Sequence, residues 1–177
     1  MSGGVNNVVV SDCQFLGTDV GLRFKSTRGR GGVVENIFID NINMIDISGD
    51  AVLFDLYYWT KNPPKEIPPV DETTPQFKNI TINNVTSFNS GKSLKFNGLP
   101  EMHIENVSIS NSVFTAIDGG LLSESTGVKL ENVSIRSKKG SALTINNVKD
   151  AQLVNCKLFS PEESILRTGK NENIVIK

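Results

Sequence analysis

The sequence lacks most of the features that mark common classes of protein. It carries 18 Lys and Arg against 19 Asp and Glu, and the formal net charge of -1 indicates neither nucleic acid nor a membrane surface as a partner. It contains no run of about eighteen apolar residues, so we expect no membrane-spanning helix. A phosphate-binding Gly-x-x-x-x-Gly-Lys motif and a signal-peptide pattern at the start are also absent. No motif predicts a metal or a cofactor.

Amphipathic helices are missing too, because no stretch of about twelve residues carries apolar side chains at the helical spacing. One phrase recurs instead, in which an Asn is followed by alternating apolar residues and a second Asn or Asp. Its copies begin at Asn7, Asn36, Asn79, Asn106, Asn132, Asp150 and Asn173. Their starts lie 29, 43, 27, 26, 18 and 23 positions apart. A period of this size indicates repeats that bury their apolar sides by stacking.

Each period also contains a second short strand, as in residues 20–24 and 93–96, whose alternation places apolar side chains inward. A rung of strand, turn, strand and turn predicts an all-β fold, a right-handed, single-stranded parallel β-helix of about seven rungs. We expect residues 1–177 to form a single β-helix domain with a Pro-rich loop insertion at about 57–76. The recurring Asn residues should adopt the left-handed conformation at the bends and share amide hydrogen bonds between rungs.

Only two cysteines are present, which excludes a disulfide framework. The repeat places Cys13 and Cys156 at the same position of different rungs, and five rungs at the usual strand spacing amount to about 24 Å. A disulfide requires Cα atoms within about 7 Å of each other. We therefore expect two free thiols that are buried as small apolar side chains.

The segment 21–32 differs from the rest because it gathers four cations and several glycines. Arg23 and Lys25 are two apart on a strand, so both side chains should point outward while Phe24 points to the core. Two cations on one face can hold an anionic ligand, the Arg as a bidentate partner and the Lys as a point charge. The glycines would let a ligand or a neighbouring loop come close. The alternative is a solvated basic edge.

The stretch 21–26, Gly-Leu-Arg-Phe-Lys-Ser, follows an Asn-rich strand and resembles glycoside hydrolase family 28, the polygalacturonases and related pectin hydrolases. The resemblance implies a pectin lyase-like β-helix in which Arg23 and Lys25 of an Arg-x-Lys motif bind the substrate carboxylate next to the scissile bond. It also implies a substrate-binding tyrosine, for which Tyr58 is the first choice and Tyr57 the second. Packing under the inserted loop is the alternative for these aromatic residues.

The sequence departs from that family in the groups that carry out the chemistry. Inverting hydrolysis needs two carboxyl groups flanking the bond. The family supplies them from Asn-Thr-Asp, Asp-Asp and Gly-His-Gly motifs. None of these motifs occurs, and the single histidine, His103, lies far downstream where we expect a surface or turn residue. The departure implies a C-terminal portion of a larger enzyme that lacks the catalytic residues and is inactive alone.

The remaining acidic residues fall mostly at rung turns, where Asp is a common turn former. Asp50 and Asp55 flank a strand near Arg23 and could line the same groove. Trp59 should anchor the Pro-rich loop, which would form a wall of that groove. The other aspartates considered are Asp19, Asp40 and Asp46.

These observations predict part of a glycoside hydrolase that acts on galacturonate-containing polysaccharide by inverting hydrolysis, with a polysaccharide or oligogalacturonide as its partner. The resemblance implies a periplasmic or secreted parent enzyme. The alternative is a non-catalytic β-helix for carbohydrate binding or structure. An isomerase or lyase on the same fold would need a base that no residue clearly supplies. Because residues 8–10 would form an exposed first rung, we also expect self-association through that edge.

Overall fold

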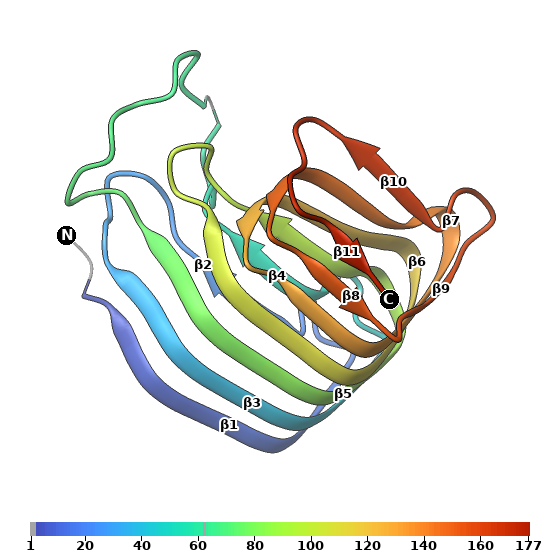
Figure 1. Cartoon of the computed structure of the whole chain (residues 1–177). Helices are drawn as coiled ribbons and strands as arrows, with labels where there is room; N and C mark the ends of the chain where they lie inside the picture. The colour runs from blue at the N-terminus through green and yellow to red at the C-terminus, as the bar shows by residue number, and fades with distance from the viewer. Residues whose placement is uncertain (1–2, 62) are drawn as a thin grey trace.

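The computed structural model describes residues 3–61 and 63–177, and every regular element within them is a strand. The strands wind round a common axis as stacked rungs (Figure 1). No helix in this part of the chain is long and apolar enough to cross a membrane. The strands are β1 (Val5–Leu16), β2 (Leu22–Lys25), β3 (Val33–Ile45), β4 (Asp50–Asp55), β5 (Gln76–Asn97), β6 (Ile104–Thr126), β7 (Lys129–Lys149), β8 (Gln152–Val154), β9 (Lys157–Phe159), β10 (Ile165–Thr168) and β11 (Val175–Ile176).

All eleven strands belong to one sheet that is wound into a helix. Its first ladder follows the order β1-β3-β5-β6-β7-β8-β11, which is one strand for each of seven rungs. A second ladder joins β2 to β4, continues through the later parts of β5, β6 and β7, and ends on β10. Every pairing between the named strands is parallel, and parallel crossovers adopt the right hand. The predicted right-handed parallel β-helix is confirmed.

Residues in the left-handed conformation line up at the bends of successive rungs. The column that we call the first bend has φ values between 52° and 69°, and consists of Asn7, Asn36, Asn79, Asn106, Gly127, Asp150 and Asn173. The register supports this alignment, because Val8, Ile37 and Ile80 pair immediately after it. Asn tolerates this conformation better than most residues, and Gly has no Cβ to oppose it. The backbone role predicted for the recurring Asn residues is confirmed.

The prediction that Asn132 starts a copy of the same phrase is wrong by one bend. The register pairs Val133 with Ser112, which places Asn132 over Asn111 in a second bend. Asn132 Nδ2 donates to Asn111 Oδ1 at 3.0 Å, and Asn155 Nδ2 donates to Asn132 Oδ1 at 2.7 Å. The first-bend position of this rung is filled by a glycine, which satisfies the backbone without resembling Asn in the sequence. The predicted amide ladder between rungs is confirmed by these bonds.

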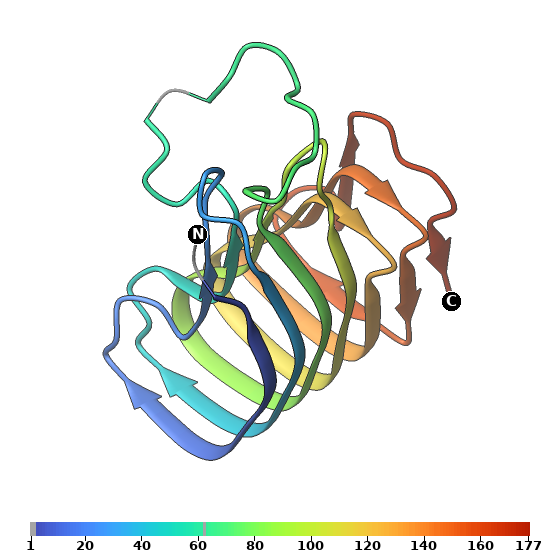
Figure 2. The same cartoon turned by 90° about the vertical axis from the view of Figure 1, so that its left-hand side faces the viewer.

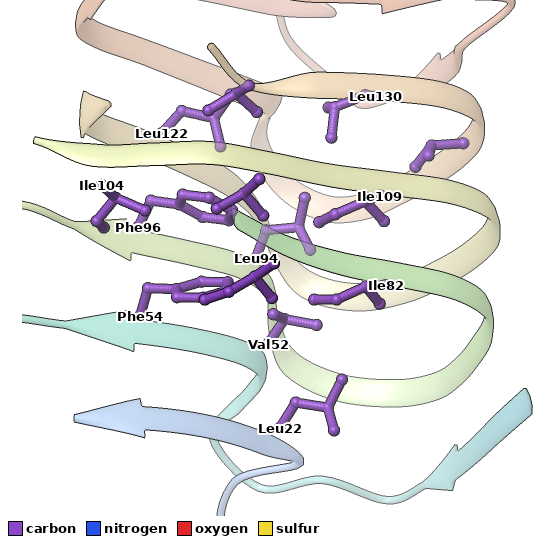
Figure 3. Packing of buried hydrophobic residues seen from close by; sticks show 14 of the residues in the cluster. Leu22, Val52, Phe54, Ile82, Leu94, Phe96, Ile104, Ile109, Leu122 and Leu130 are labelled. Atoms are coloured by element: carbon purple, nitrogen blue, oxygen red, sulfur yellow. The ribbon is translucent and has the colours of Figure 1, made fainter. Parts of the chain in front are cut away.

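The interior holds a stack of side chains from the second ladder. Phe24 packs face to face on Phe54 with ring centroids 4.4 Å apart, and the Phe54 and Phe96 centroids are 4.6 Å apart. Phe54 and Phe96 are fully buried, and Leu122 continues the column (Figure 3). Burial of one such side chain stabilises the fold by about 1.5–3 kcal/mol. The stack therefore fixes β2 to the rungs that follow it.

Cys13 and Cys156 are both free thiols, as predicted. Each is half-buried against the core, not fully buried as expected. The reason is that β1, which contains Cys13, and β9, which follows Cys156, each pair with a rung on one side only. Burial raises the pKa of the Cys156 thiol.

The segment between β4 and β5 leaves the stack of rungs and returns across the Gly-rich turn after β2. Residues 63–75 extend away from the body of the molecule (Figure 2). Thr73 O accepts hydrogen bonds from the amides of Gly29 and Gly31 at 3.1 and 2.8 Å. A Cβ on Gly31 would lie 2.2 Å from Glu72 O, so this approach requires glycine. The neighbour that these glycines admit is therefore a loop of the same chain.

Candidate functional site

Arg23 and Lys25 project outward from β2, the first strand of the second ladder. The two cationic side chains are exposed, while Phe24 between them is half-buried and stacked on Phe54. The outward and inward alternation predicted for this strand is confirmed. Because the aromatic stack holds the intervening residue in the core, the two cations are presented to solvent on a rigid element.

Tyr58 reaches the same place from a turn 33 residues further along the chain. This turn lies beside the segment after β2: Tyr58 N donates to Ser26 O at 3.1 Å, and Thr27 forms an antiparallel bridge with Tyr57. Lys25 Nζ donates to the Tyr58 hydroxyl at 3.2 Å and lies 4.3 Å from the centre of its ring. This hydrogen bond from Lys25 lowers the pKa of the Tyr58 phenol. We call Lys25, Tyr58 and the neighbouring Arg23 of β2 the cluster.

Arg23 is paired with a carboxylate of its own turn. Its guanidinium Nη2 donates to the carboxylate of Asp19, whose side chain is 78% exposed. The hydrogen bond from Arg23 holds the pKa of Asp19 below its usual range. Exposed ion pairs of this kind are weak. A ligand carboxylate can therefore replace Asp19 on Arg23 at little cost.

Tyr57, the second choice for a substrate-binding tyrosine, packs in a different direction. The guanidinium of Arg28 lies 4.9 Å from the centre of the Tyr57 ring. Arg28 also forms a bidentate ion pair with Glu101, whose side chain is 5% exposed, with Nη2 donating to Oε2 at 2.8 Å. Arg28 lowers the pKa of the Glu101 carboxyl. We call Arg28, Tyr57 and Glu101 the clamp, because they join the turn after β2 to a turn 73 residues away.

The expectation that Trp59 anchors the Pro-rich loop is wrong. Its side chain is 85% exposed, and its ring stacks on Tyr58 with centroids 5.6 Å apart. The loop is held instead by the Gly-rich turn, where the two backbones bond directly. Trp59 therefore packs beside Tyr58 and does not hold the loop. Sequence reasoning also missed Glu101, since a contact across 73 positions leaves no local signal.

The aspartates near the cluster differ in their surroundings. Asp55 Oδ1 accepts hydrogen bonds from Tyr57 N at 3.0 Å and from Asn97 Nδ2 at 2.8 Å, so it holds the turn that carries Tyr58. Asp50 pairs with Lys92 in the register and is half-buried, and this burial raises its pKa. Two further aspartates accept amide hydrogen bonds from the next rung, as turn and ladder residues: Asp40 from Asn83 and Asp46 from Asn89.

His103 lies apart from the cluster, in the turn before β6 on the first ladder. It is half-buried, with Nδ1 2.8 Å from Thr126 Oγ1 and Nε2 3.4 Å from Glu124 Oε2. It is thus a turn residue, as predicted, although it is partly covered. In residues 3–61 and 63–177, no three His, Cys, Asp or Glu side chains are grouped to hold a metal ion.

Comparisons with known proteins identify the family of the chain. The family model of the glycosyl hydrolases family 28 matches residues 2–123. The chain belongs to this family. Two curated relatives are polygalacturonases, one from Ralstonia solanacearum that is 34% identical and one from Ralstonia nicotianae that is 33% identical, each over 96 residues. Both alignments cover 52% of this chain but 16% of the relative, so the chain spans a small part of those proteins. No solved structure matches it significantly.

The match to glycosyl hydrolases family 28 confirms the resemblance that was based on the Arg-x-Lys motif. The matched residues contain Arg23, Lys25 and Tyr58, and also the clamp. The roles of these individual residues stay predictions, because membership of a family does not assign them. What the structure adds is that three residues chosen from the sequence lie on two adjoining segments of one surface.

Proposed function

We propose that this chain forms the substrate-carboxylate-binding part of a glycoside hydrolase that acts on galacturonate-containing polysaccharide. The observation that carries the proposal is the cluster of Arg23, Lys25 and Tyr58, in which the Lys25 ammonium is held against the tyrosine. Two cations beside an aromatic hydroxyl suit a ligand that carries both a carboxylate and hydroxyl groups. A uronic acid is such a ligand.

Each group has a distinct part in binding. Arg23 exchanges the exposed Asp19 carboxylate for that of the sugar and can hold it through two parallel hydrogen bonds. Lys25 adds a point charge whose position is fixed by Tyr58. Since the Tyr58 oxygen accepts its hydrogen bond from Lys25, its own proton is available to donate to a sugar hydroxyl.

We further propose that the chain binds this substrate without cleaving it. Inverting hydrolysis needs an acid and a base whose carboxyl groups are about 6.5–9.5 Å apart across the bond. The family's Asn-Thr-Asp, Asp-Asp and Gly-His-Gly motifs are absent from the sequence. Of the two carboxylates nearest the cluster in the chain, Asp19 is released when a ligand takes its place on Arg23, whereas Asp55 stays engaged by two donors. This engagement also supports the alternative of a non-catalytic carbohydrate-binding β-helix. The two functions differ only in whether catalytic carboxylates of the whole protein act on the bound sugar.

The test is a calorimetric titration with trigalacturonate and with the neutral galactotriose. We expect wild type to bind the anionic trimer, and Arg23→Ala or Lys25→Ala to weaken binding about tenfold, as loss of a charged hydrogen bond implies. The matched control is Lys157→Ala, which removes an exposed lysine from β9 and should change nothing. Equal binding of galactotriose, or full affinity in both cation variants, contradicts the proposal.

A second measurement addresses turnover. Polygalacturonate is incubated with the chain and new reducing ends are counted. We expect none above the buffer control. Turnover that persists in Arg23→Ala would refute both the absence of catalysis and the assignment of the site.

A further inference from the structure

A pocket of about 250 Å³ adjoins the cluster. It is lined by Lys25, Ser26, Thr27, Arg30, Tyr58 and Trp59. Lys25 and Tyr58 are shared with the cluster, whereas Arg23 does not line the pocket. The pocket therefore extends the surface toward Arg30 and Trp59, two residues that the proposed function does not use.

Trp59 is displayed in this pocket in a way that packing does not explain. At 85% exposure it is the most exposed large apolar side chain of residues 3–61 and 63–177. It occupies the third position of a turn closed by Thr60 N and Tyr57 O at 2.7 Å, with φ at 64°. That position favours Gly or Asn, and a bulky residue rarely adopts this φ. Neither burial nor backbone preference accounts for a tryptophan here.

Arg30 supplies a cation next to this ring. Its amide donates to Thr27 O at 3.2 Å, so its backbone is held in the turn after β2, while its side chain is exposed. No ion pair joins Arg30 to any carboxylate of the part of the chain that the structure describes. An open aromatic face and an open cation thus lie in one pocket, beside the second cation, Lys25.

The chemistry of the pocket matches one class of ligand. The C–H groups on one face of a pyranose ring stack on an indole, and a carboxylate on the same ring can reach an arginine. A simple anion would use Arg30 but not Trp59, and a neutral sugar would use Trp59 but not Arg30. A uronate residue uses both.

We propose that this pocket is a second uronate subsite, in which Trp59 stacks on the sugar ring and Arg30 binds its carboxylate. It would hold the sugar next to the one bound at Arg23 and Lys25, so the inference rests on the proposed function. Two adjoining subsites make affinity depend on the length of the oligosaccharide.

Trp59 also reports on its own subsite, because it is the single tryptophan of the chain. We expect trigalacturonate to shift the tryptophan emission to shorter wavelength and to protect it from acrylamide quenching. Sulfate and galactotriose at the same concentration should do neither, since each satisfies only one half of the pocket. Tryptophan emission thus separates occupancy of this pocket from binding elsewhere on the cationic surface.

Calorimetry with galacturonic acid and trigalacturonate then measures the contribution of the subsite. In Trp59→Ala and Arg30→Gln the preference for the trimer over the monomer should fall about three- to tenfold, the range expected for one aromatic contact or charged hydrogen bond. Trp59→Phe keeps an aromatic face and should retain most of the preference. Arg167→Ala, which removes an exposed arginine from β10, is the matched control and should leave the preference unchanged.

The outcomes separate the two proposals. If trigalacturonate binds and Arg23→Ala weakens it, but Trp59 emission and the Trp59→Ala preference do not change, the second subsite is refuted and the proposed function stands. If wild type binds no uronate, both are refuted. If sulfate or galactotriose protects Trp59 as well as the trimer does, the pocket is not a uronate subsite.

Discussion

The turns of this protein are of two kinds, and they are held in place differently. The bends of the rungs repeat, and many of them bond to the equivalent bend one rung away, as Asn132 does with Asn111 and Asn155. The turns 26–30 and 57–60, which carry Arg30 and Tyr58, do not repeat and are held by unique contacts with each other and with Glu101. Stacking thus builds the scaffold and fixes the strand that carries Arg23 and Lys25, whereas Tyr58 and Arg30 lie where the repeat is interrupted.

The largest effect is expected from a change to the scaffold. Phe54→Ala removes the fully buried ring between Phe24 and Phe96 and leaves a cavity in the stack. We expect a loss of about 3–5 kcal/mol in the free energy of unfolding, measured by urea denaturation. A loss below about 1 kcal/mol would show that the stack does not fix the rungs. Phe159→Ala, on an exposed ring of β9, is the control.

A change to the clamp should cause an intermediate loss of stability and should also weaken binding at the site. Glu101→Ala leaves the Arg28 guanidinium without its bidentate partner, for which we expect a loss of about 1–3 kcal/mol in stability. Because the clamp positions the turn that carries Tyr58, trigalacturonate affinity should also fall. Glu163→Ala removes an exposed carboxylate elsewhere and should alter neither quantity. Unchanged affinity in Glu101→Ala would show that the clamp does not position the site.

A single bend should contribute less to the free energy of unfolding, because the hydrogen bonds of the ladder are distributed over many bends. Asn111→Ala forces a Cβ-bearing residue without a polar side chain into φ 48°, and removes the bonds to Asn83 and Asn132. We expect a loss of about 1–2 kcal/mol from the backbone conformation. Asn111→Gly loses the same bonds but accepts the φ, so the difference between the two variants measures the backbone part. Equal stability of both variants would contradict the role assigned to this conformation.

The smallest effect is a change in pH dependence. Burial raises the pKa of Asp50, so the native state holds this proton more tightly than the unfolded chain does, whose value is near 3.8. The Tm of wild type should therefore fall relative to the Tm of Asp50→Asn as the pH rises from about 3 to about 7. Asp71 gives the opposite sign, because hydrogen bonds from Thr73 lower its pKa. The same trend in Asp50→Asn and Asp71→Asn would contradict this assignment.

The sequence predicted the scaffold well because its information is local and repeated. Alternation and recurring Asn residues were enough for the fold, the number of rungs and the direction of Arg23 and Lys25. The start of the repeat was predicted wrongly at Asn132, because Gly127 occupies the first bend of that rung without the Asn side chain that marks the other copies. Contacts across the fold left no pattern to detect. The hydrogen bond between Gly31 and the returning loop is an example of such a contact. The exposure of Trp59 could be known only once its turn was placed in the structure.

The most direct test of the account is a crystal structure of the chain with trigalacturonate. We predict one uronate carboxylate within about 3 Å of the Arg23 guanidinium and of Lys25 Nζ, with Asp19 displaced. The same structure would show whether the adjoining sugar lies on Trp59. A trimer bound instead between Lys92 and Lys139, which line another cationic pocket of the same helix, with Arg23 still paired to Asp19, would contradict it.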